Sequence, residues 1–225
     1  MPQKQRLAEA LTRVINLRRS LMADAATVAR WQAVKRYQSQ RLRSTYADLL
    51  QVPRYRAAAE FFLDDLYGER DFEQRDREVL RIVPSLARML PESAVETLAL
   101  AVELDELSEI LDARVAGFVE LPLDETGYTR AYCRAGTRAE RQRQIAMVDR
   151  IGRSLDRLAR LPLLAGMLRL MRVPAEAAGL HHLHQFLTHG FVSFRAMGGA
   201  GEFLDIVRRR ELALMEEMFS AAPDA

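Results

Sequence analysis

Apolar residues recur along this chain at spacings of three and four, which place side chains on one face of an α-helix. No stretch alternates apolar and polar residues over the length of a strand between turn signals. Prolines and glycines interrupt the pattern where helices would end. The pattern predicts helices over residues 4–21, 24–49, 54–67, 73–89, 92–119, 125–134, 138–160, 163–172, 177–196 and 200–219.

Local end signals and short connections support one helical bundle. Asp124 and Thr137 precede expected helices as N-cap residues, and Thr137 with Glu140 has the spacing of a capping box. The expected connections are short, without a low-complexity linker, and the sequence has no internal repeat. A chain of 225 residues buries enough apolar surface to fold without a metal or a disulfide. The sequence therefore predicts an all-α fold, a single-domain multi-helix bundle spanning residues 1–225.

The composition favours a protein of the cytoplasm. Cys133 is the one cysteine, so no internal disulfide can form, which is typical of a reducing compartment. We interpret Cys133 as a small buried residue in preference to a thiol activated by Arg134. The amino terminus leads into an amphipathic helix, and runs such as residues 161–168 fall short of the roughly 20 apolar residues that a membrane span needs. We expect a cytoplasmic protein with no membrane span.

Charge is distributed in blocks, although the net charge is only +2. Residues 1–50 carry ten Lys+Arg against three Asp+Glu, residues 60–125 carry six against eighteen, and residues 126–172 carry eleven against three. One interpretation is that basic helices dock on the acidic middle of the same fold. The other is a basic face for nucleic acid or anionic lipid. The arginines of helix 138–160 have no interleaved aromatic residues and no readout motif, which disfavours nucleic acid.

The segment Phe61–Gly68 combines aromatic residues with two adjacent carboxylates. On an α-helix, Phe62 would lie on the apolar face, and Phe61 would turn away from it toward the carboxylates. Either this helix is packed on both faces, or Phe61 marks an exposed patch.

The carboxylates of this segment, Asp64 and Asp65, have two interpretations. They could form a pair for acid/base chemistry or metal binding. Adjacent helical residues diverge by about 100°, however, so the two side chains do not easily face one small site. Structural ion pairs are therefore favoured, with Arg70 and Arg75 as candidate partners.

All histidines of the chain lie in the expected helix 177–196, at His181, His182, His184 and His189. His181 and His184 are one turn apart and could bind one metal, but no carboxylate stands at ligand spacing. Surface or packing roles are therefore favoured, and we expect no metal and no cofactor. If one histidine is functional, it is His184, which borders the apolar face where a ligand or a buried hydrogen bond could tune it.

Other catalytic signatures are absent. The chain has no phosphate-binding loop, dinucleotide fingerprint, nucleophile elbow or His-Glu-x-x-His motif. The glycine-rich segment 198–201 opens the last expected helix, where free N–H groups could hold an anion, although a simple turn between helices explains it as well.

The motif Phe61-Phe62-Leu63-Asp64-Asp65-Leu66-Tyr67-Gly68, followed by Arg70-Asp71-Phe72 and Arg75-Asp76, resembles the signature of a family of uncharacterised bacterial all-helical proteins with a Phe-Phe-Leu-x-x-Leu-Tyr-Gly motif. Gly190-Phe191, Phe194-Arg195 and Arg210-Glu211 are similar to that family too. The resemblance implies an all-helical fold and a bacterial source, and it assigns no activity. The candidate ligand-binding or functional residues of the chain are Asp64, Asp65, Tyr67, His181, His184 and Arg195.

Two function classes remain open from the sequence. The favoured one is a non-enzymatic protein that binds a partner or a small-molecule ligand, either alone or as a homodimer. The alternative is a small-molecule or metal-dependent helical enzyme that uses the His181–His189 helix together with the Asp64/Asp65 helix.

Overall fold

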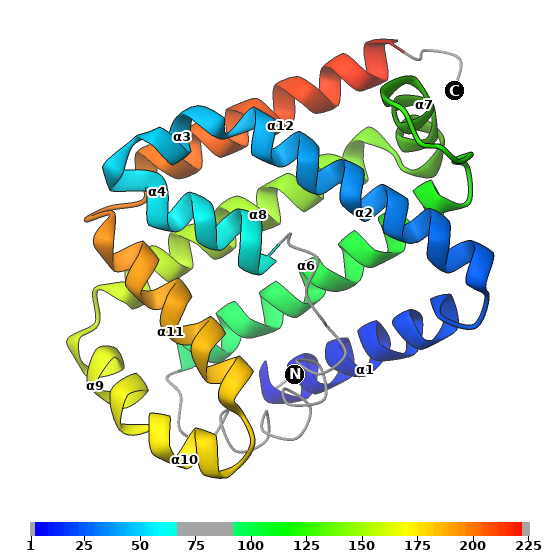
Figure 1. Ribbon diagram of the computed structural model, residues 1–225. Helices are drawn as coiled ribbons and strands as arrows, with labels where there is room; N and C mark the ends of the chain where they lie inside the picture. The colour runs from blue at the N-terminus through cyan, green and yellow to red at the C-terminus, as the bar shows by residue number, and fades with distance from the viewer. Residues whose placement is uncertain (1–2, 67–91, 222–225) are drawn as a thin grey trace.

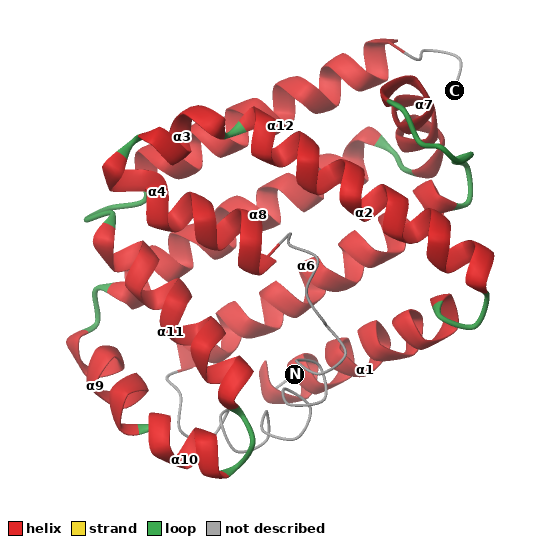
Figure 2. Ribbon diagram, in the orientation of Figure 1, coloured by secondary structure: helices red, strands yellow, loops and turns green. Residues whose placement is uncertain are grey.

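Helices account for almost all of the chain that the computed structural model describes, residues 3–66 and 92–221. No strand occurs within these residues (Figure 2). In chain order the elements are α1 (Gln3–Leu21), α2 (Ala25–Thr45), α3 (Ala47–Gln51), α4 (Pro53–Glu60), the π-helix η1 (Phe61–Leu66), α6 (Glu92–Ala116), α7 (Glu125–Ala135), α8 (Arg138–Ala159), α9 (Pro162–Leu170), α10 (Arg172–Ala177), α11 (His181–Ala196) and α12 (Gly201–Ala221). The all-α class is confirmed, and the expected helix 73–89 lies outside the described residues.

The long helices form two packed layers (Figure 1). Helices α1, α6, α8 and α12 lie next to one another in that order, and each contacts the next. Helices α2, α4 and α11 cover this row, with α2 on α6 and with α11 between α8 and α4. Helix α7 packs on α6 and α12, while α9 and α10 form a corner beside α8 and α11. None of the helices in the described ranges is long and apolar enough to span a bilayer.

The N-caps act as the sequence predicts. The carboxylate of Asp124 accepts a hydrogen bond of 2.7 Å from the backbone N–H of Gly127, so it caps α7. Thr137 and Glu140 form the complete capping box at the start of α8. Each cap satisfies a backbone N–H that has no partner inside the helix, which fixes where the helix begins.

The structure differs from the prediction at helix 24–49, which breaks at Tyr46 into α2 and α3. Tyr46 leaves helical geometry at φ −113° and ψ 15°, and its side chain is buried. Its hydroxyl donates to the Glu211 carboxylate of α12 at 2.7 Å. A tertiary partner therefore sets this break, and no local signal in the sequence encodes it.

Oppositely charged helices dock on each other within the fold, which is the intramolecular interpretation of the charge blocks. The basic helix α1 runs along the acidic helix α6, with ion pairs from Arg6 to Glu103 and, at 2.6 Å, from Arg13 to Glu106. These outer pairs are partly exposed, so each contributes at most about 1 kcal/mol.

The innermost pairs converge on Glu109 of α6, whose side chain is fully buried. Its carboxylate accepts hydrogen bonds from Arg18 of α1 at 3.0 Å, from the Trp31 indole at 3.1 Å and from Lys35 of α2 at 2.9 Å. Lys35 also lies 3.1 Å from the carboxylate of Asp112. The Glu109 network thus joins α1, α2 and α6 around the buried carboxylate of Glu109.

These partners decide the ionisation of the network. Burial alone would raise the pKa of Glu109, but the charges of Lys35 and Arg18 outweigh burial and hold that pKa below its ordinary value. Burial likewise opposes the charge on Lys35, yet Asp112 and Glu109 raise its pKa above the ordinary value. Both groups are therefore charged at neutral pH.

We predict that Glu109→Gln destabilises the protein by about 3 kcal/mol at neutral pH, because Arg18 and Lys35 lose the buried counter-charge that they share. Arg18 keeps Asp105 at 2.8 Å and Lys35 keeps Asp112 at 3.1 Å, which limits the loss. The folded pKa of Glu109 is lower than its unfolded pKa. The stability due to its charge is therefore present above the unfolded pKa, near 4.3, and is lost as the pH falls through the folded pKa. Urea unfolding at several pH values measures this.

The matched control is Glu106→Gln, one turn away on α6, whose partner Arg13 is half exposed. This variant should lose about 1 kcal/mol or less. Equal losses from the two variants at neutral pH would contradict the central role of Glu109.

Candidate functional site

The two segments in which the sequence predicts candidate residues, η1 and α11, pack against each other. The Phe61 ring lies 5.4 Å from the Phe186 ring and 5.5 Å from the His189 ring. A Cβ added to Gly190 would lie 2.8 Å from Phe61 Cζ, so the glycine lets the ring approach the α11 backbone. The contact is closed aromatic packing, and neither of the two hollows described below is lined by both segments.

Phe61 is 3% exposed, so the helix is packed on both faces and the exposed-patch alternative is wrong. Leu63 is also buried, and Phe62 is half-buried against the same core cluster. A π-helical turn bonds each N–H five residues back, so the α-helical wheel misplaces the residues that follow. Phe61 itself begins the π-turn and is buried because α11 packs on this second face of the helix.

Asp64 pairs with a residue that the sequence did not suggest. Its carboxylate forms an ion pair with Arg43 of α2, and both side chains are about half exposed. The side chain of Asp65, together with Tyr67, Arg70 and Arg75, lies outside the described residues. Asp64 therefore has a structural ion pair, as expected, with α2 as the partner element.

The histidines of α11 do not gather at one site. His181 is exposed, and its ring meets the His182 ring edge-on at 5.4 Å. His184 is half-buried, and its Nε2 lies 2.8 Å from the backbone oxygen of Leu168. A carbonyl oxygen only accepts, so Nε2 carries the proton and donates. His184 thereby ties α11 to α9. Within the described ranges, no three His, Cys, Asp or Glu side chains gather as metal ligands.

Arg195 lies at a shallow hollow of about 280 Å³ beside the turn before α12, lined also by Asp156, Arg160 and Gly199. The Asp156 carboxylate accepts from the backbone N–H of Ala200 at 3.1 Å and pairs with Arg160 at 2.8 Å. A carboxylate of the protein therefore occupies the helix start where an anion would bind. Gly198 and Gly199 have positive φ values of 63° and 138°, which favours the turn interpretation of this segment.

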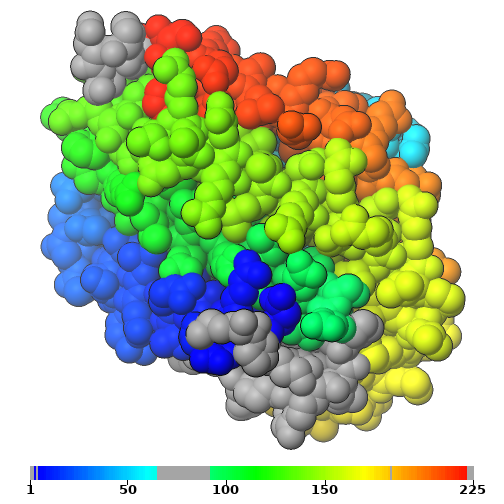
Figure 3. Space-filling view, turned by 180° about the vertical axis from the view of Figure 1, so that it is seen from behind, coloured from blue at the N-terminus to red at the C-terminus, as the bar shows by residue number. Residues whose placement is uncertain are grey.

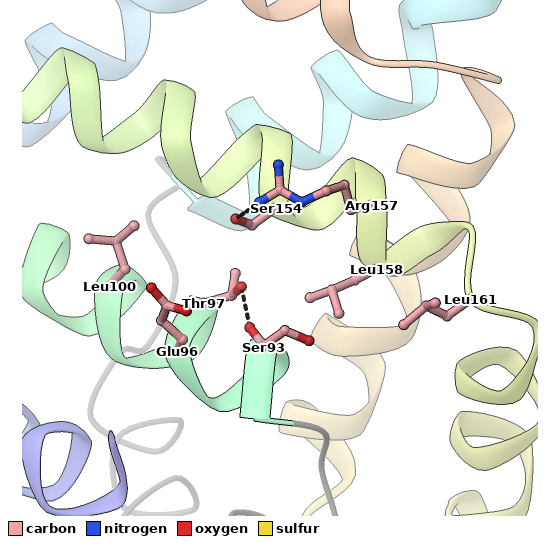
Figure 4. Close-up of a pocket in the computed structure, with 8 residues that line it drawn as sticks. All are labelled: Ser93, Glu96, Thr97, Leu100, Ser154, Arg157, Leu158 and Leu161. Atoms are coloured by element: carbon pink, nitrogen blue, oxygen red, sulfur yellow. Dashed lines mark hydrogen bonds between the residues drawn. The ribbon is translucent and has the colours of Figure 1, made fainter. Parts of the chain in front are cut away.

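A second hollow, of about 240 Å³, lies between the start of α6 and the end of α8 (Figure 4). Two hydrogen bonds join polar groups of its lining: Thr97 donates to the backbone oxygen of Ser93 at 2.7 Å, and Arg157 donates to the Ser154 hydroxyl at 2.8 Å. Glu96, the carboxylate in the lining, forms an ion pair with Arg150 at 3.0 Å. Leu158 and Leu161 line the side of the hollow toward α9.

Beyond this hollow, α9 and α10 present the most exposed apolar side chains of the described chain. Leu163, Leu170 and Val173 are 88%, 79% and 71% exposed. Leu163 and Leu170 are seven residues apart and so share a face of α9. Between them, a Cβ on Gly166 would meet no atom within 4 Å. We call this surface, residues 161–173, the α9–α10 corner; Figure 3 shows this part of the chain in yellow at the edge of the molecule.

The opposite side of α9 attaches the corner to the body. Leu164, Met167 and Leu168 are half-buried, and α9 has no fully buried residue. The corner also carries the exposed Arg169 and Arg172, and Arg172 pairs with Glu176 at 3.2 Å. The sequence patterns did not predict this surface. The sequence feature that corresponds to it is the apolar run between Arg160 and Arg169, which is too short to span a membrane.

Cys133 is half-buried and donates to the backbone oxygen of Met218 at 3.3 Å. Burial raises the pKa of its thiol above the ordinary value, and the nearby charges of Arg138 and Arg141 only partly oppose this. The thiol is therefore mostly protonated at neutral pH, as the packing interpretation expects.

The chain belongs to a family described as a domain of unknown function (DUF8198), whose family model matches residues 17–225. No curated protein and no solved structure matches the chain. Membership supports the expectation of an uncharacterised family and assigns no residue a role.

We predict that Gly190→Ala lowers the melting temperature, because the new methyl group would overlap the Phe61 ring. Overpacking of about 1–3 kcal/mol outweighs the gain of about 1 kcal/mol in helix propensity. The control is Gly166→Ala, also a helical glycine but in open space, which should raise stability by up to about 1 kcal/mol. Shifts of the same sign in both variants would show that Phe61 does not hold α11 in place.

Proposed function

We propose that this member of the DUF8198 family is a non-enzymatic binding protein and that the α9–α10 corner is the surface by which it binds its partner. The observation that carries the proposal is the exposure of Leu163, Leu170 and Val173 on adjoining helices. Monomeric proteins rarely expose contiguous apolar patches larger than a few hundred Å², and an apolar patch with a charged border is typical of an interaction site. A partner that covers the corner would remove these side chains from water.

The geometry of the corner favours a large partner over a small ligand. The three side chains project from the outside of the helices, whereas a small-molecule site encloses its ligand. Leu161, at the start of the corner, also reaches the hollow beside α6, so an apolar group of the partner could extend into it.

The contacts of Asp64 and His184 weigh against the alternative of a helical enzyme. That alternative requires η1 and α11 to line one site, but these elements meet through the packed Phe61 ring. Asp64 is paired with Arg43, and His184 bonds to the backbone of Leu168. The proposal therefore includes no metal and no cofactor. We further propose that the protein is bacterial, as the motif implies, and that it is located in the cytoplasm, as the single cysteine favours.

Cysteine labelling tests whether a partner covers the corner. We predict that Leu170→Cys, in a Cys133→Ser background, reacts rapidly with a maleimide in the purified protein, because position 170 is 79% exposed. In permeabilised cells that naturally produce the protein, the same thiol should react several-fold more slowly.

The control is Arg208→Cys, an exposed position on α12. It should react equally fast in both preparations. Equal labelling of position 170 in cells and in the purified protein would contradict the proposed function, whatever the nature of the partner.

A further inference from the structure

We infer that the partner of the α9–α10 corner is the surface of an anionic phospholipid bilayer, on which α9 lies flat with its aliphatic face among the lipids. The inference rests on the proposed function and names the partner. It depends on three properties of the corner: its aliphatic stripe, its positive charge and its outward position.

The stripe has the composition of an interfacial helix. Leu163 and Leu170 are the fully projecting residues of α9, and Val173 extends the stripe onto α10. Between positions 161 and 173 the large apolar residues are all aliphatic or methionine, and the charged residues are Arg169 and Arg172. Short helices with leucines on one face and arginines beside them bind at the boundary between headgroups and acyl chains.

The charge around the stripe is complementary to anionic lipid. Between Asp156 and Glu202 the sequence has five arginines and a single carboxylate, Glu176. Arg169 and Arg172 lie on the same two helices as the stripe and are exposed. Long arginine side chains can keep their guanidinium groups among the phosphates while the neighbouring leucines enter the apolar region.

The same charge argues against a second copy of this chain as the partner. A two-fold interface would bring the corner against itself, so the arginines of both copies, Arg169 and Arg172, would gather in one interface. Glu176 is the one carboxylate close in sequence, and it already pairs with Arg172. A nucleic acid fits poorly as well, because the centre of the corner is aliphatic and offers no aromatic ring for base stacking.

Co-sedimentation of the full-length protein with lipid vesicles tests the inference. Vesicles of phosphatidylcholine mixed with phosphatidylglycerol should bind the protein at least about tenfold more tightly than vesicles of phosphatidylcholine alone. Higher ionic strength should weaken the binding. Inorganic phosphate at equal ionic strength should not compete beyond that effect, which separates a bilayer surface from a site for free phosphate.

Two double variants should each reduce binding to anionic vesicles by about tenfold or more. Leu163→Glu with Leu170→Glu removes the stripe, and Arg169→Glu with Arg172→Glu reverses the charge. All four positions are exposed, so melting temperatures should stay close to that of the wild type.

Matched controls change the same properties elsewhere. Met22→Glu replaces an apolar residue that is 54% exposed at the α1–α2 turn, on the far side of the molecule from α9 (Figure 1). Arg208→Glu with Arg209→Glu makes the same charge change on α12. Both controls should bind anionic vesicles within about twofold of the wild type, since surface changes away from the site are close to neutral.

The outcomes separate the inference from the proposed function. Absence of binding to anionic vesicles, or binding that the corner variants leave unchanged, would overturn the lipid inference. If the thiol at position 170 is nevertheless protected in cells, the function stands with a different partner. A concentration-dependent dimer that Leu163→Glu with Leu170→Glu abolishes would identify that partner as a second copy and would also overturn the lipid inference.

Discussion

The full burial of the Glu109 carboxylate is the constraint on which the arrangement of the first long helices depends. A buried anion is tolerated only where donors and opposite charges surround it. Here they come from two other helices, as Arg18 of α1 and as Trp31 and Lys35 of α2. A shift of α1 by one turn would move Arg18 about 5.4 Å along the helix axis and out of reach of Glu109. We interpret the network as the feature that fixes the register of α1 and α2 on α6.

The sequence predicted the helical class and most helix boundaries because those signals are local. Thr137 and Glu140 cap α8 through atoms within one turn, so their spacing alone identifies the helix start. The break at Tyr46 could not be found in this way, because its cause is a hydroxyl bonded to Glu211, far along the chain. The π-helical turn at Phe61 has the same character, since it packs against α11.

The charge blocks predicted intramolecular docking in outline, but not which residues are buried. Glu103, Glu106 and Glu109 have the same side chain and lie on one helix, yet only Glu109 is fully buried. The candidate residues show a similar limit. Asp64 and His184 were identifiable as unusual residues, whereas their partners Arg43 and Leu168 come from other helices. The α9–α10 corner was missed because an apolar run has the same appearance in sequence whether it is buried or exposed.

The hydrogen bond from His184 to Leu168 has a mechanical consequence for the corner. Among the described residues, half-buried side chains of α9 and this bond to α11 attach α9 to the body. Helix α11 is in turn seated on Phe61, whose ring fits against Gly190. The aromatic motif and the exposed corner, about a hundred residues apart in the sequence, are thus connected through α11. The position of the α9 leucines therefore depends in part on the packing of Phe61.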